Sequence, residues 1–295
     1  MNHTTLLIFK LVAETQSVTQ AAKQLGRAQS NITTRIQQLE EELEAELFVR
    51  GNKKMLLSPA GQNFLSYARR ILSLAEEAKL ALHPARPTGT LKLGAMEACA
   101  ASRLPAILPL FQQRCPDADL TLRTMPTRQL TELVENSTLD CALVSLPAGP
   151  DGSLQCPQTL EYLPLFIEQL VLIAPVEGRD YRFAAFPAGC TYRQRGIEYL
   201  QQTGTHVDIV EVSSYHAMMA NVATGRYACL LPESVLALLT LPAGCQTQYV
   251  TQAATQLIWR RGYVSPILDA LRQLLLVPAA GNQPGGSQQH AAGRQ

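Results

Sequence analysis

Apolar positions in the first 57 residues recur at helical spacing, and they predict three short helices. The inward-facing positions are Leu6, Phe9, Val12 and Ala13, then Ala21, Ala22 and Leu25, then Ile32, Ile36, Leu39 and Leu43. Ser17 begins a capping box for the second helix, and Gly26 permits a tight turn before the third helix starts near Ala28. Two helices joined by a short turn can place the second helix in a DNA major groove. This stretch therefore predicts a helix-turn-helix.

A hairpin and a long helix are predicted next. Residues 51–54 (GNKK) are a turn signal, so the segment 47–57 is interpreted as a small β-wing. Ser58 then caps a new helix, with Pro59 in its first position. The apolar positions that follow at spacings of four and three, close to a coiled-coil seam, are Phe64, Ala68, Ile71, Ala75, Ala78 and Leu82. Either a partner helix or another part of the same chain buries this seam.

Strand-like and helix-like segments alternate from residue 90 onward, after the breaker-rich stretch 83–89 (HPARPTG). Strands are predicted at 91–95, 120–124, 141–145, 207–212, 228–231 and 256–260, and helices at 104–113, 128–135, 215–223, 233–239 and 264–275. A strand pair at 161–175 is expected to lead into a second lobe. Such alternation is typical of parallel sheets covered by helices. The low-complexity tail 278–295 is predicted to be disordered.

The composition is that of a globular protein of about two domains. Of the 295 residues 46% are apolar, which excludes a disordered or collagen-like chain. Apolar runs stay short of the ~18–20 residues of a membrane span, and the N-terminus lacks signal-peptide features. We therefore expect a cytoplasmic protein without membrane contact. Residues 1–88 carry 11 Lys and Arg against 8 acids, so this segment is the better candidate for contact with an anionic partner.

Seven cysteines are scattered along the chain without a C-x-x-C motif. This spacing argues against a zinc finger and a disulfide framework, so we expect no metal and no cofactor. Two alternative functions would use the cysteines. Cys190 or Cys229 would serve a redox sensor, although no resolving partner stands out. Cys190 with His206 or His216 would supply the nucleophile and base of an enzyme, although the chain has no nucleophile elbow.

The motifs of residues 5–75 resemble those of LysR-type transcriptional regulators. The shared positions, in the order and spacing of that family, are Ala21-Ala22, Leu25, Gln29-Ser30, Arg35-Ile36, Leu39-Glu40, Leu47-Phe48, Arg50 and Ser58-Pro59-Ala60-Gly61. A looser similarity continues from 90 to 276. The resemblance implies a winged helix-turn-helix at 1–57, a linker and dimerisation helix with a hinge at 58–88, and an α/β effector-binding domain at 89–277. This domain would resemble a type 2 periplasmic binding protein, with one lobe at about 89–160 and 264–277 and the other at about 161–263.

The resemblance also implies a function, that of a sequence-specific regulator of transcription rather than an enzyme. The expected partners are double-stranded operator or promoter DNA, a small-molecule effector between the lobes, and further copies of the chain in a homodimer or homotetramer. RNA polymerase is a further candidate partner. The effector would act by binding two DNA-bound assemblies with different affinity. A thiol-based redox sensor of the same architecture and a cysteine-dependent enzyme are the alternatives.

The start of the third helix carries the candidate DNA contacts. Gln29 can form two hydrogen bonds with adenine, and Arg35 can bind a phosphate or a guanine edge. Positive charge on the wing suits the DNA backbone or the minor groove. The full set of expected contacts is Gln29, Ser30, Asn31, Thr33, Thr34, Arg35, Arg50, Lys53 and Lys54. Ala28 stands where the family usually has a Ser or Thr that caps the third helix. The acidic run that begins at Glu40 is expected to stay outside the major groove.

The ends of the predicted strands supply the candidate effector contacts, because ligands of two-lobed α/β proteins bind at strand ends and helix N-termini. The expected contacts are Met96, Glu97, Ala98, Thr127, Ser145, Thr191, Tyr192, Ser213, Ser214 and Tyr215. Many family members have Ser or Thr at the position of Ala98. The alanine therefore argues against a simple small acid as the effector, and the adjacent Glu97 would favour an amine or a cation. Arg193 and Arg195 would either bind a carboxylate or lie on an exposed helix surface.

Overall fold

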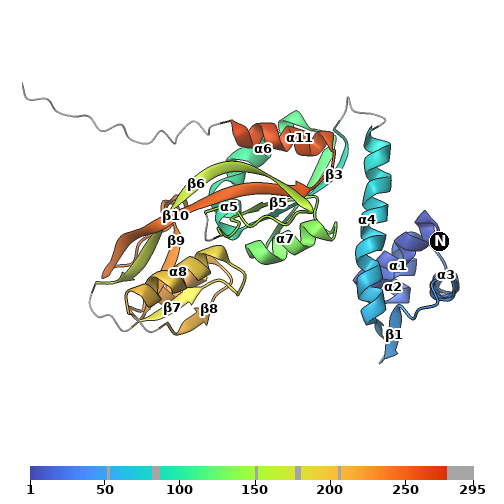
Figure 1. Ribbon diagram of the computed structural model, residues 1–295, viewed down its shortest axis with the longest axis horizontal. Helices are drawn as coiled ribbons and strands as arrows, with labels where there is room; N and C mark the ends of the chain where they lie inside the picture. Colours follow the sequence, from blue (N-terminus) through green and yellow to red (C-terminus); the bar gives the residue numbers. More distant parts are fainter. Residues whose placement is uncertain (52–53, 82–86, 150–151, 177–180, 205–206, 278–295) are drawn as a thin grey trace, which may run out of the picture.

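The computed structural model describes residues 1–51, 54–81, 87–149, 152–176, 181–204 and 207–277. Within these ranges the chain forms an N-terminal unit and a larger α/β domain, and a long helix lies between them (Figure 1). Several expectations fall outside the described residues: Lys53, Leu82, His206, most of the hinge and the tail 278–295. No helix of the described part has both the length and the apolar character that a bilayer crossing requires.

The N-terminal unit has the helices and the wing that the sequence predicts. Its elements are α1 (His3–Thr15), α2 (Val18–Leu25), α3 (Gln29–Glu42), β1 (Phe48–Gly51) and β2 (Lys54–Leu57), with the two strands paired antiparallel. Phe9 of α1 is completely buried, and its ring lies 5.4 Å from that of Phe48 and 5.1 Å from that of Phe64. This aromatic cluster fixes the wing and the long helix against α1, because offset aromatic contacts add specific geometry to apolar burial.

Local capping explains where these helices begin. The Ser17 side chain accepts a hydrogen bond from the Gln20 N–H, and Gly26 ends α2 with a φ of 61°, which glycine adopts without strain. The Ser58 hydroxyl accepts from the Gly61 N–H at 2.9 Å. Gly61 has no room for a side chain, since a Cβ there would lie 2.0 Å from the Leu47 carbonyl oxygen. The Ser-Pro-Ala-Gly motif therefore packs the long helix directly onto the wing.

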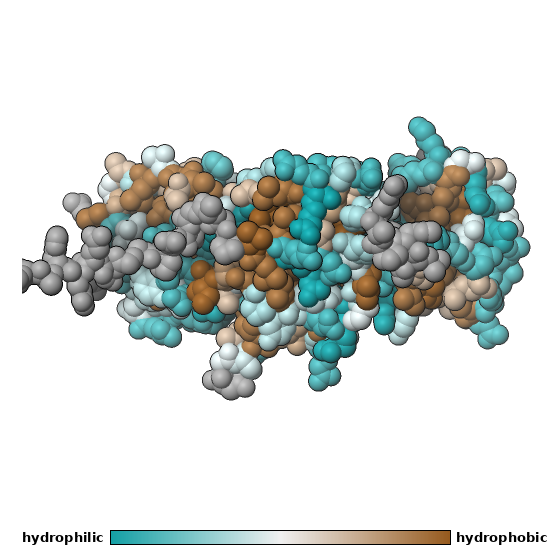
Figure 2. All heavy atoms as spheres, turned by 90° about the horizontal axis from the view of Figure 1, so that it is seen from above, coloured by the Kyte–Doolittle hydropathy of each residue, from teal (hydrophilic) through white to brown (hydrophobic). Residues whose placement is uncertain are grey.

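The long helix α4 (Pro59–Ala81) divides its apolar residues between two faces, which corrects the predicted seam. Phe64 and Ala68 belong to the core of the N-terminal unit instead of a free seam. The large apolar side chains left exposed in the described part of α4 are Tyr67, Ile71 and Leu74, at 52%, 41% and 65%. Apolar patches remain visible on the surfaces of both units (Figure 2). The seam is displaced because α1 covers the face that the spacing alone left open.

The α/β domain is built on one eight-stranded sheet in the order β4-β3-β5-β10-β6-β9-β7-β8. Its strands are β3 (Gly89–Ala95), β4 (Ala118–Thr124), β5 (Cys141–Val144), β6 (Leu160–Pro175), β7 (Arg182–Ala185), β8 (Ile209–Glu211), β9 (Tyr227–Pro232) and β10 (Cys245–Arg260). Its helices are α5 (Glu97–Ser102), α6 (Leu104–Arg114), α7 (Thr127–Glu135), α8 (Thr191–Gln202), α9 (Tyr215–Val222), α10 (Glu233–Leu236) and α11 (Pro266–Leu276). Parallel β3, β4 and β5 form one lobe, and parallel β7, β8 and β9 form the other.

Two long antiparallel strands join the lobes and correct the sequence interpretation. The expected strand pair at 161–175 is the single strand β6, which runs beside β10 between the lobes (Figure 1). Pro164 sits at a register shift between Thr255 and Gln256, and a bulge of this kind accommodates a proline inside a sheet. The first half of β10 was not predicted as a strand, because it is mostly exposed and polar and shows no hydrophobic alternation. The short elements α5 and β7 and the longer helix α8 were also not predicted, and α10 is shorter than expected.

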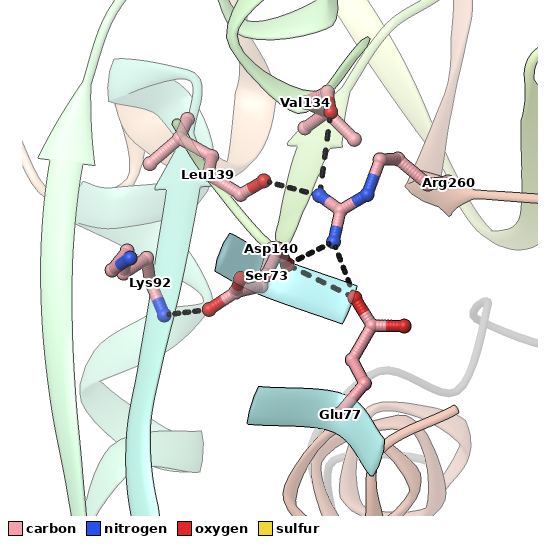
Figure 3. A network of polar contacts seen from close by, with 7 residues as sticks. All are labelled: Ser73, Glu77, Lys92, Val134, Leu139, Asp140 and Arg260. Carbon is pink, nitrogen blue, oxygen red and sulfur yellow. Dashed lines mark hydrogen bonds and ion pairs between the residues drawn. The ribbon is translucent and has the colours of Figure 1, made fainter. Parts of the chain in front are cut away.

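A polar network connects α4 to the α/β domain (Figure 3). The Arg260 guanidinium donates to the Leu139 carbonyl oxygen at 3.1 Å and, in the other direction, to the Ser73 hydroxyl at 3.0 Å. It also forms an ion pair with Glu77 at 3.2 Å, where the two side chains are only 12% and 18% exposed. Beside it, Asp140 accepts from the backbone N–H of Lys92, and burial raises the pKa of the Asp140 carboxyl.

We expect Glu77→Gln to loosen α4 from the α/β domain. Losing the charge of one partner in a largely buried, hydrogen-bonded pair costs about 1–3 kcal/mol. Amide hydrogen exchange in the last turns of α4 should therefore rise about fivefold or more. Glu76→Gln is the matched control, because Glu76 pairs with Lys79 at the surface with both side chains at least 60% exposed. Equal exchange in the two variants would contradict a structural role for this ion pair.

Candidate DNA interface and ligand cavity

The first turns of α3 present a row of polar side chains to solvent. Ile32, Ile36 and Leu39 are buried on the opposite face, and this anchors the helix to the N-terminal unit. The exposed residues are Gln29, Ser30, Asn31, Thr33 and Thr34. Thr33 uses its hydroxyl as a donor to the Gln29 carbonyl, while the remaining polar groups face outward. The stretch thus has the amphipathic form of a helix that is held on one face and free on the other.

The basic residues expected to contact DNA lie on two elements, α3 and the wing. Arg35 is half-buried at the edge of the exposed face. In the wing, Arg50 pairs with Met55 across the hairpin, and Lys54 is exposed at the start of β2. The backbone N–H of Met55 also donates to the Gln16 carbonyl, which ties the wing to the turn between α1 and α2. The wing and α3 are therefore fixed to the same small core.

Two residues of the α3 region are unusual: the N-cap residue Ala28 and the acidic residue Glu40. Ala28 is the N-cap of α3 and supplies no side-chain hydrogen bond, so the amino-terminal N–H groups lack that partner. Glu40 accepts hydrogen bonds from the N–H groups of Leu47 and Phe48, at 2.8 and 3.0 Å. Its carboxylate therefore anchors the wing to α3. Sequence reasoning grouped Glu40 with the surface acids because the contact joins residues seven and eight positions apart.

A cavity of about 220 Å³ lies where the lobes meet. Its walls come from the segments that follow β3, β4, β7 and β8, together with the first turn of α8. Met96, Met125 and Phe186 contribute apolar surface, and the Phe186 ring meets that of Tyr215 edge-on at 5.0 Å. The Thr127 hydroxyl is already engaged, since it donates to the Met96 sulfur and accepts from the Ser145 N–H, both at 3.3 Å. The cavity is thus mostly apolar, with few polar groups in its wall.

Two hydrogen bonds hold the lobes together beside this cavity. The Arg128 N–H at the start of α7 donates to the Gly189 carbonyl at 3.2 Å. The Thr191 hydroxyl at the start of α8 donates to the Ser145 carbonyl. Gly189 has a φ of 93°, and a Cβ there would lie 3.0 Å from the Arg128 Cβ, so glycine is needed for this close approach. The cavity is bounded by groups whose contacts depend on the relative position of the lobes.

Most of the expected effector contacts line this cavity, but three do not. Those that line it are Met96, Glu97, Ala98, Thr127, Tyr192, Ser213 and Tyr215. Ser145 is completely buried behind the wall, and Ser214 uses its side chain to cap α9. Thr191 faces a neighbouring, more polar pocket of about 660 Å³, where Arg193 and Arg195 also lie.

Sequence reasoning missed several walls of the cavity. These residues are Thr124, Met125, Gln129, Phe186, Pro187 and Cys190. Three of them follow β7, a four-residue strand without a clear hydrophobic alternation, so the strand end that positions them went unrecognised. Met125 and Gln129 flank the predicted Thr127 and would have been found by extending the strand-end rule by two residues on either side.

Buried hydroxyl groups in the cavity wall stay protonated. Burial raises the pKa of Tyr192 and of Tyr215 well above the ordinary tyrosine value. For Tyr215 the negative charge of Glu97 adds to the rise. Burial likewise raises the pKa of the Cys190 thiol, against the opposing effect of nearby backbone N–H groups. The tyrosines and the cysteine therefore contribute no charge to the cavity near neutral pH.

An ion pair behind the cavity links the two crossing strands to the first lobe. Arg103, between α5 and α6, donates two hydrogen bonds to one oxygen of Glu168, at 3.0 and 2.7 Å. Glu168 belongs to β6 and is 4% exposed, and the Arg103 guanidinium also lies 4.5 Å from the centre of the Phe166 ring. Neither residue was singled out from the sequence, because their pairing depends on the crossing path of β6. In the described part of the chain, no three His, Cys, Asp or Glu side chains gather as metal ligands would.

Comparison with known proteins identifies both units. Residues 3–62 match the family model for the bacterial regulatory helix-turn-helix protein of the lysR family, and residues 84–277 match that for the LysR substrate binding domain. The HTH-type transcriptional regulator YofA of Bacillus subtilis is 35% identical over 238 residues, covering 78% of this chain and 81% of the relative. The regulator GltR of the same organism is 34% identical over 248 residues, covering 80% and 81%.

Solved structures agree on the fold. A full-length OxyR variant from Pseudomonas aeruginosa superposes with a TM-score of 0.73 at 19% identity, covering 96% of this chain and 99% of that one. CbnR, described as a LysR family transcriptional regulator, gives a TM-score of 0.63 at 24% identity, covering 93% and 98%. Full-length CbnR in complex with its target DNA gives 0.62 at 22% identity, covering 93% and 99%. With the helix-turn-helix, the wing and the two-lobed domain in one chain, this protein belongs to the LysR family of DNA-binding transcriptional regulators.

Proposed function

We propose that this regulator recognises its operator with the amino-terminal half of α3. The observation that carries the proposal is the exposure of Gln29, Ser30, Asn31, Thr33 and Thr34 on a helix whose other face is buried. A recognition helix contacts base edges through its amino-terminal residues. Gln29 suits adenine, and the uncapped N-terminus of α3 suits a phosphate group. The surface acids Glu41 and Glu42, at the other end of the helix, remain outside the groove.

Basic residues would supply the contacts to the DNA backbone. We assign this role to Arg35, Arg50, Lys53 and Lys54, because positive side chains that neutralise phosphates provide much of the affinity for DNA. A regulator that binds a promoter acts on transcription by assisting or blocking RNA polymerase, so the polymerase is a proposed functional partner. Binding to chromosomal DNA also assigns the protein to the cytoplasm.

A second copy of the chain would cover the exposed stripe of α4. Tyr67, Ile71 and Leu74 line one wall of a groove of about 570 Å³, and Arg261 and Tyr263 of the effector domain lie on the other wall. An apolar stripe at spacings of four and three is the pattern by which two helices associate. The dimer would present two α3 helices to successive major grooves of an imperfect palindrome. Pairing of dimers through their effector domains would give the tetramer.

The cavity between the lobes is the proposed effector site. Its walls belong to both lobes, so a bound molecule changes the free energy of one lobe arrangement relative to another. Such a ligand alters DNA binding only to the extent that it binds the two DNA-bound assemblies with different affinity.

Cysteine chemistry receives less support than effector binding. Burial raises the pKa of Cys99 and of Cys229 to about 12, and that of Cys190 also lies above the ordinary thiol value. Reactive sensor cysteines instead have a lowered pKa, since the thiolate is the nucleophile. Cys229 and Cys245 lie on the two strands that flank β6, and this separation is wider than a disulfide can bridge. His216, the described candidate base for an enzyme, is exposed on α9.

Removing one DNA contact of α3 should weaken operator binding. We expect Gln29→Ala, which removes a base contact, and Arg35→Ala, which removes a backbone contact, each to lower the affinity by about 5- to 100-fold, or ~1–3 kcal/mol. The measurement is a gel-shift titration at fixed salt, with a duplex that the wild-type protein selects from a random library. Gln38→Ala, on the exposed distal half of α3, is the control and should bind normally. Normal binding by both test variants would remove α3 from the interface.

A charge in the exposed stripe of α4 should disrupt self-association. We expect Leu74→Glu to raise the dimer dissociation constant by at least about a hundredfold, because an unpaired carboxylate would be buried between helices. Sedimentation velocity over a concentration series gives the constant. Gln62→Glu introduces the same charge on an exposed polar position of α4 and should leave the dimer intact. A Leu74→Glu protein that sediments like the wild type would place the dimer contact elsewhere.

Oxidants should have little effect on this regulator. Because the pKa of Cys190 is raised, its alkylation by iodoacetamide at about pH 8 should be slower than that of free cysteine and should accelerate above about pH 9. Peptide mapping by mass spectrometry measures the rate at each thiol. Rapid labelling of Cys190 near neutral pH, together with a change of operator affinity on diamide treatment, would restore the redox-sensor alternative.

A further inference from the structure

The cavity between the lobes contains one charged side chain, that of Glu97. Every other lining residue is apolar, aromatic or uncharged polar, so neither Lys, Arg nor His contributes to the described wall. Within the described residues the Glu97 carboxylate has neither a hydrogen bond nor an ion pair. It occupies the first position of α5, where a negative charge also complements the helix dipole. That role accounts for an acid at this position but leaves its oxygens available to a ligand.

Three of the arginines near the cavity are already paired with acids. Arg103 is bound to the buried Glu168. Arg193 lies on the side of the neighbouring pocket, where it pairs with Glu211 at 2.6 Å and donates to the Phe186 carbonyl. Arg128 pairs with Glu132 along its own helix, on the same side. An anionic ligand would therefore enter a cavity whose described wall offers it one negative charge and no uncommitted positive charge.

The remaining wall suits an apolar body with a positively charged end. Methionine and aromatic side chains adapt to irregular apolar groups, and the faces of aromatic rings attract cations. Tyr192, Phe186 and Tyr215 supply such rings, and the last two hold a fixed edge-on geometry. The Thr127 hydroxyl already has both a donor and an acceptor contact, so it is a weak anchor for further polar groups. The volume of about 220 Å³ is below the ~300–1,000 Å³ usual for small-molecule sites, which restricts the ligand to a small one.

We propose that the effector of this regulator is a small organic cation, a protonated amine joined to an apolar or aromatic body, with its charge held at Glu97. The inference rests on the proposed role of this cavity as the effector site. It assigns a positively charged ligand to that site, whereas a carboxylate ligand would be negatively charged. The neighbouring pocket, with its arginines, is the place where an anion would bind instead.

Three probes with the same phenyl group test the ligand class. They are 2-phenylethylamine, 2-phenylethanol and 3-phenylpropanoate, which carry a cation, a neutral hydroxyl and an anion on similar short chains. Isothermal titration calorimetry on the full chain should show the amine binding about tenfold (about 1.4 kcal/mol) more tightly than the other two, because only the amine forms a charge-assisted hydrogen bond with Glu97. In Glu97→Gln this preference should fall to about twofold or less.

Two control variants identify the pocket that is used. Glu198→Gln removes an acid that lines only the neighbouring pocket, so the amine preference should persist. Ala98→Met reduces the cavity from a position that is 3% exposed and should abolish binding of the amine. Circular dichroism and melting temperature confirm that each variant is folded, and the half-exposed position of Glu97 makes Glu97→Gln the safer of the two cavity variants.

The outcomes separate this inference from the proposed function. Tighter binding of the carboxylate, an amine preference that survives Glu97→Gln, or no binding by any probe would each overturn the cationic ligand class. If wild-type protein from the same preparation still binds its selected duplex, the DNA-binding function stands in all three cases. Probe binding that Ala98→Met does not alter would instead overturn the assignment of the cavity as effector site, and the ligand class with it.

Discussion

The antiparallel pairing of β6 with β10 is the constraint on which the effector domain depends. These strands pair from Leu160 with Arg260 to Pro175 with Cys245, so they contribute to both lobes at once. The end of β10 pairs with β5 in one lobe, and the end of β6 pairs with β9 in the other. The gap between the lobes is therefore set by backbone hydrogen bonds in two continuous strands. Side chains such as Arg103 and Glu168 then tie the helices to this frame.

Burial around Phe9 performs the corresponding task in the N-terminal unit. A single completely buried ring contacts the wing through Phe48 and the long helix through Phe64. The position of α3 relative to α4 is thus fixed by a shared core, so two copies joined through α4 as proposed would hold their α3 helices at a defined separation. The helix-turn-helix and the substrate-binding domain are different units, and each is organised around one dominant interaction.

Local patterns in the sequence predicted the elements whose burial is periodic. Ile32, Ile36 and Leu39 recur at helical spacing, so α3 and its exposed polar face could be placed without coordinates. Elements that owe their position to distant contacts could not. β7 is a four-residue strand held between β8 and β9, and its omission hid the wall formed by Phe186 and the residues that follow it.

The same physical reason explains the misassigned individual residues. Glu40 resembled a surface acid, but its carboxylate accepts from two N–H groups of the wing, and no spacing rule encodes that contact. Phe64 and Ala68 fitted a coiled-coil seam, but α1 covers them. Around the cavity, the sequence located the ends of several strands. It did not show that Ser145 is buried behind the wall or that the side chain of Ser214 caps α9.

The position of α7 gives the Arg260 network a wider consequence. At its first turn, Thr127 lines the cavity and the Arg128 N–H holds Gly189 of the opposite lobe. The Val134 carbonyl near the other end of this nine-residue helix and the Leu139 carbonyl beyond it both accept from the Arg260 guanidinium, which also bonds to Glu77 of α4. A displacement of this lobe that carries α7 and Arg260 relative to α4 would strain or break the Arg260 contacts with Ser73 and Glu77. With the proposed α4 dimer and effector site, occupancy of the effector domain would thereby be linked to the spacing of the two operator halves through one short helix and one arginine.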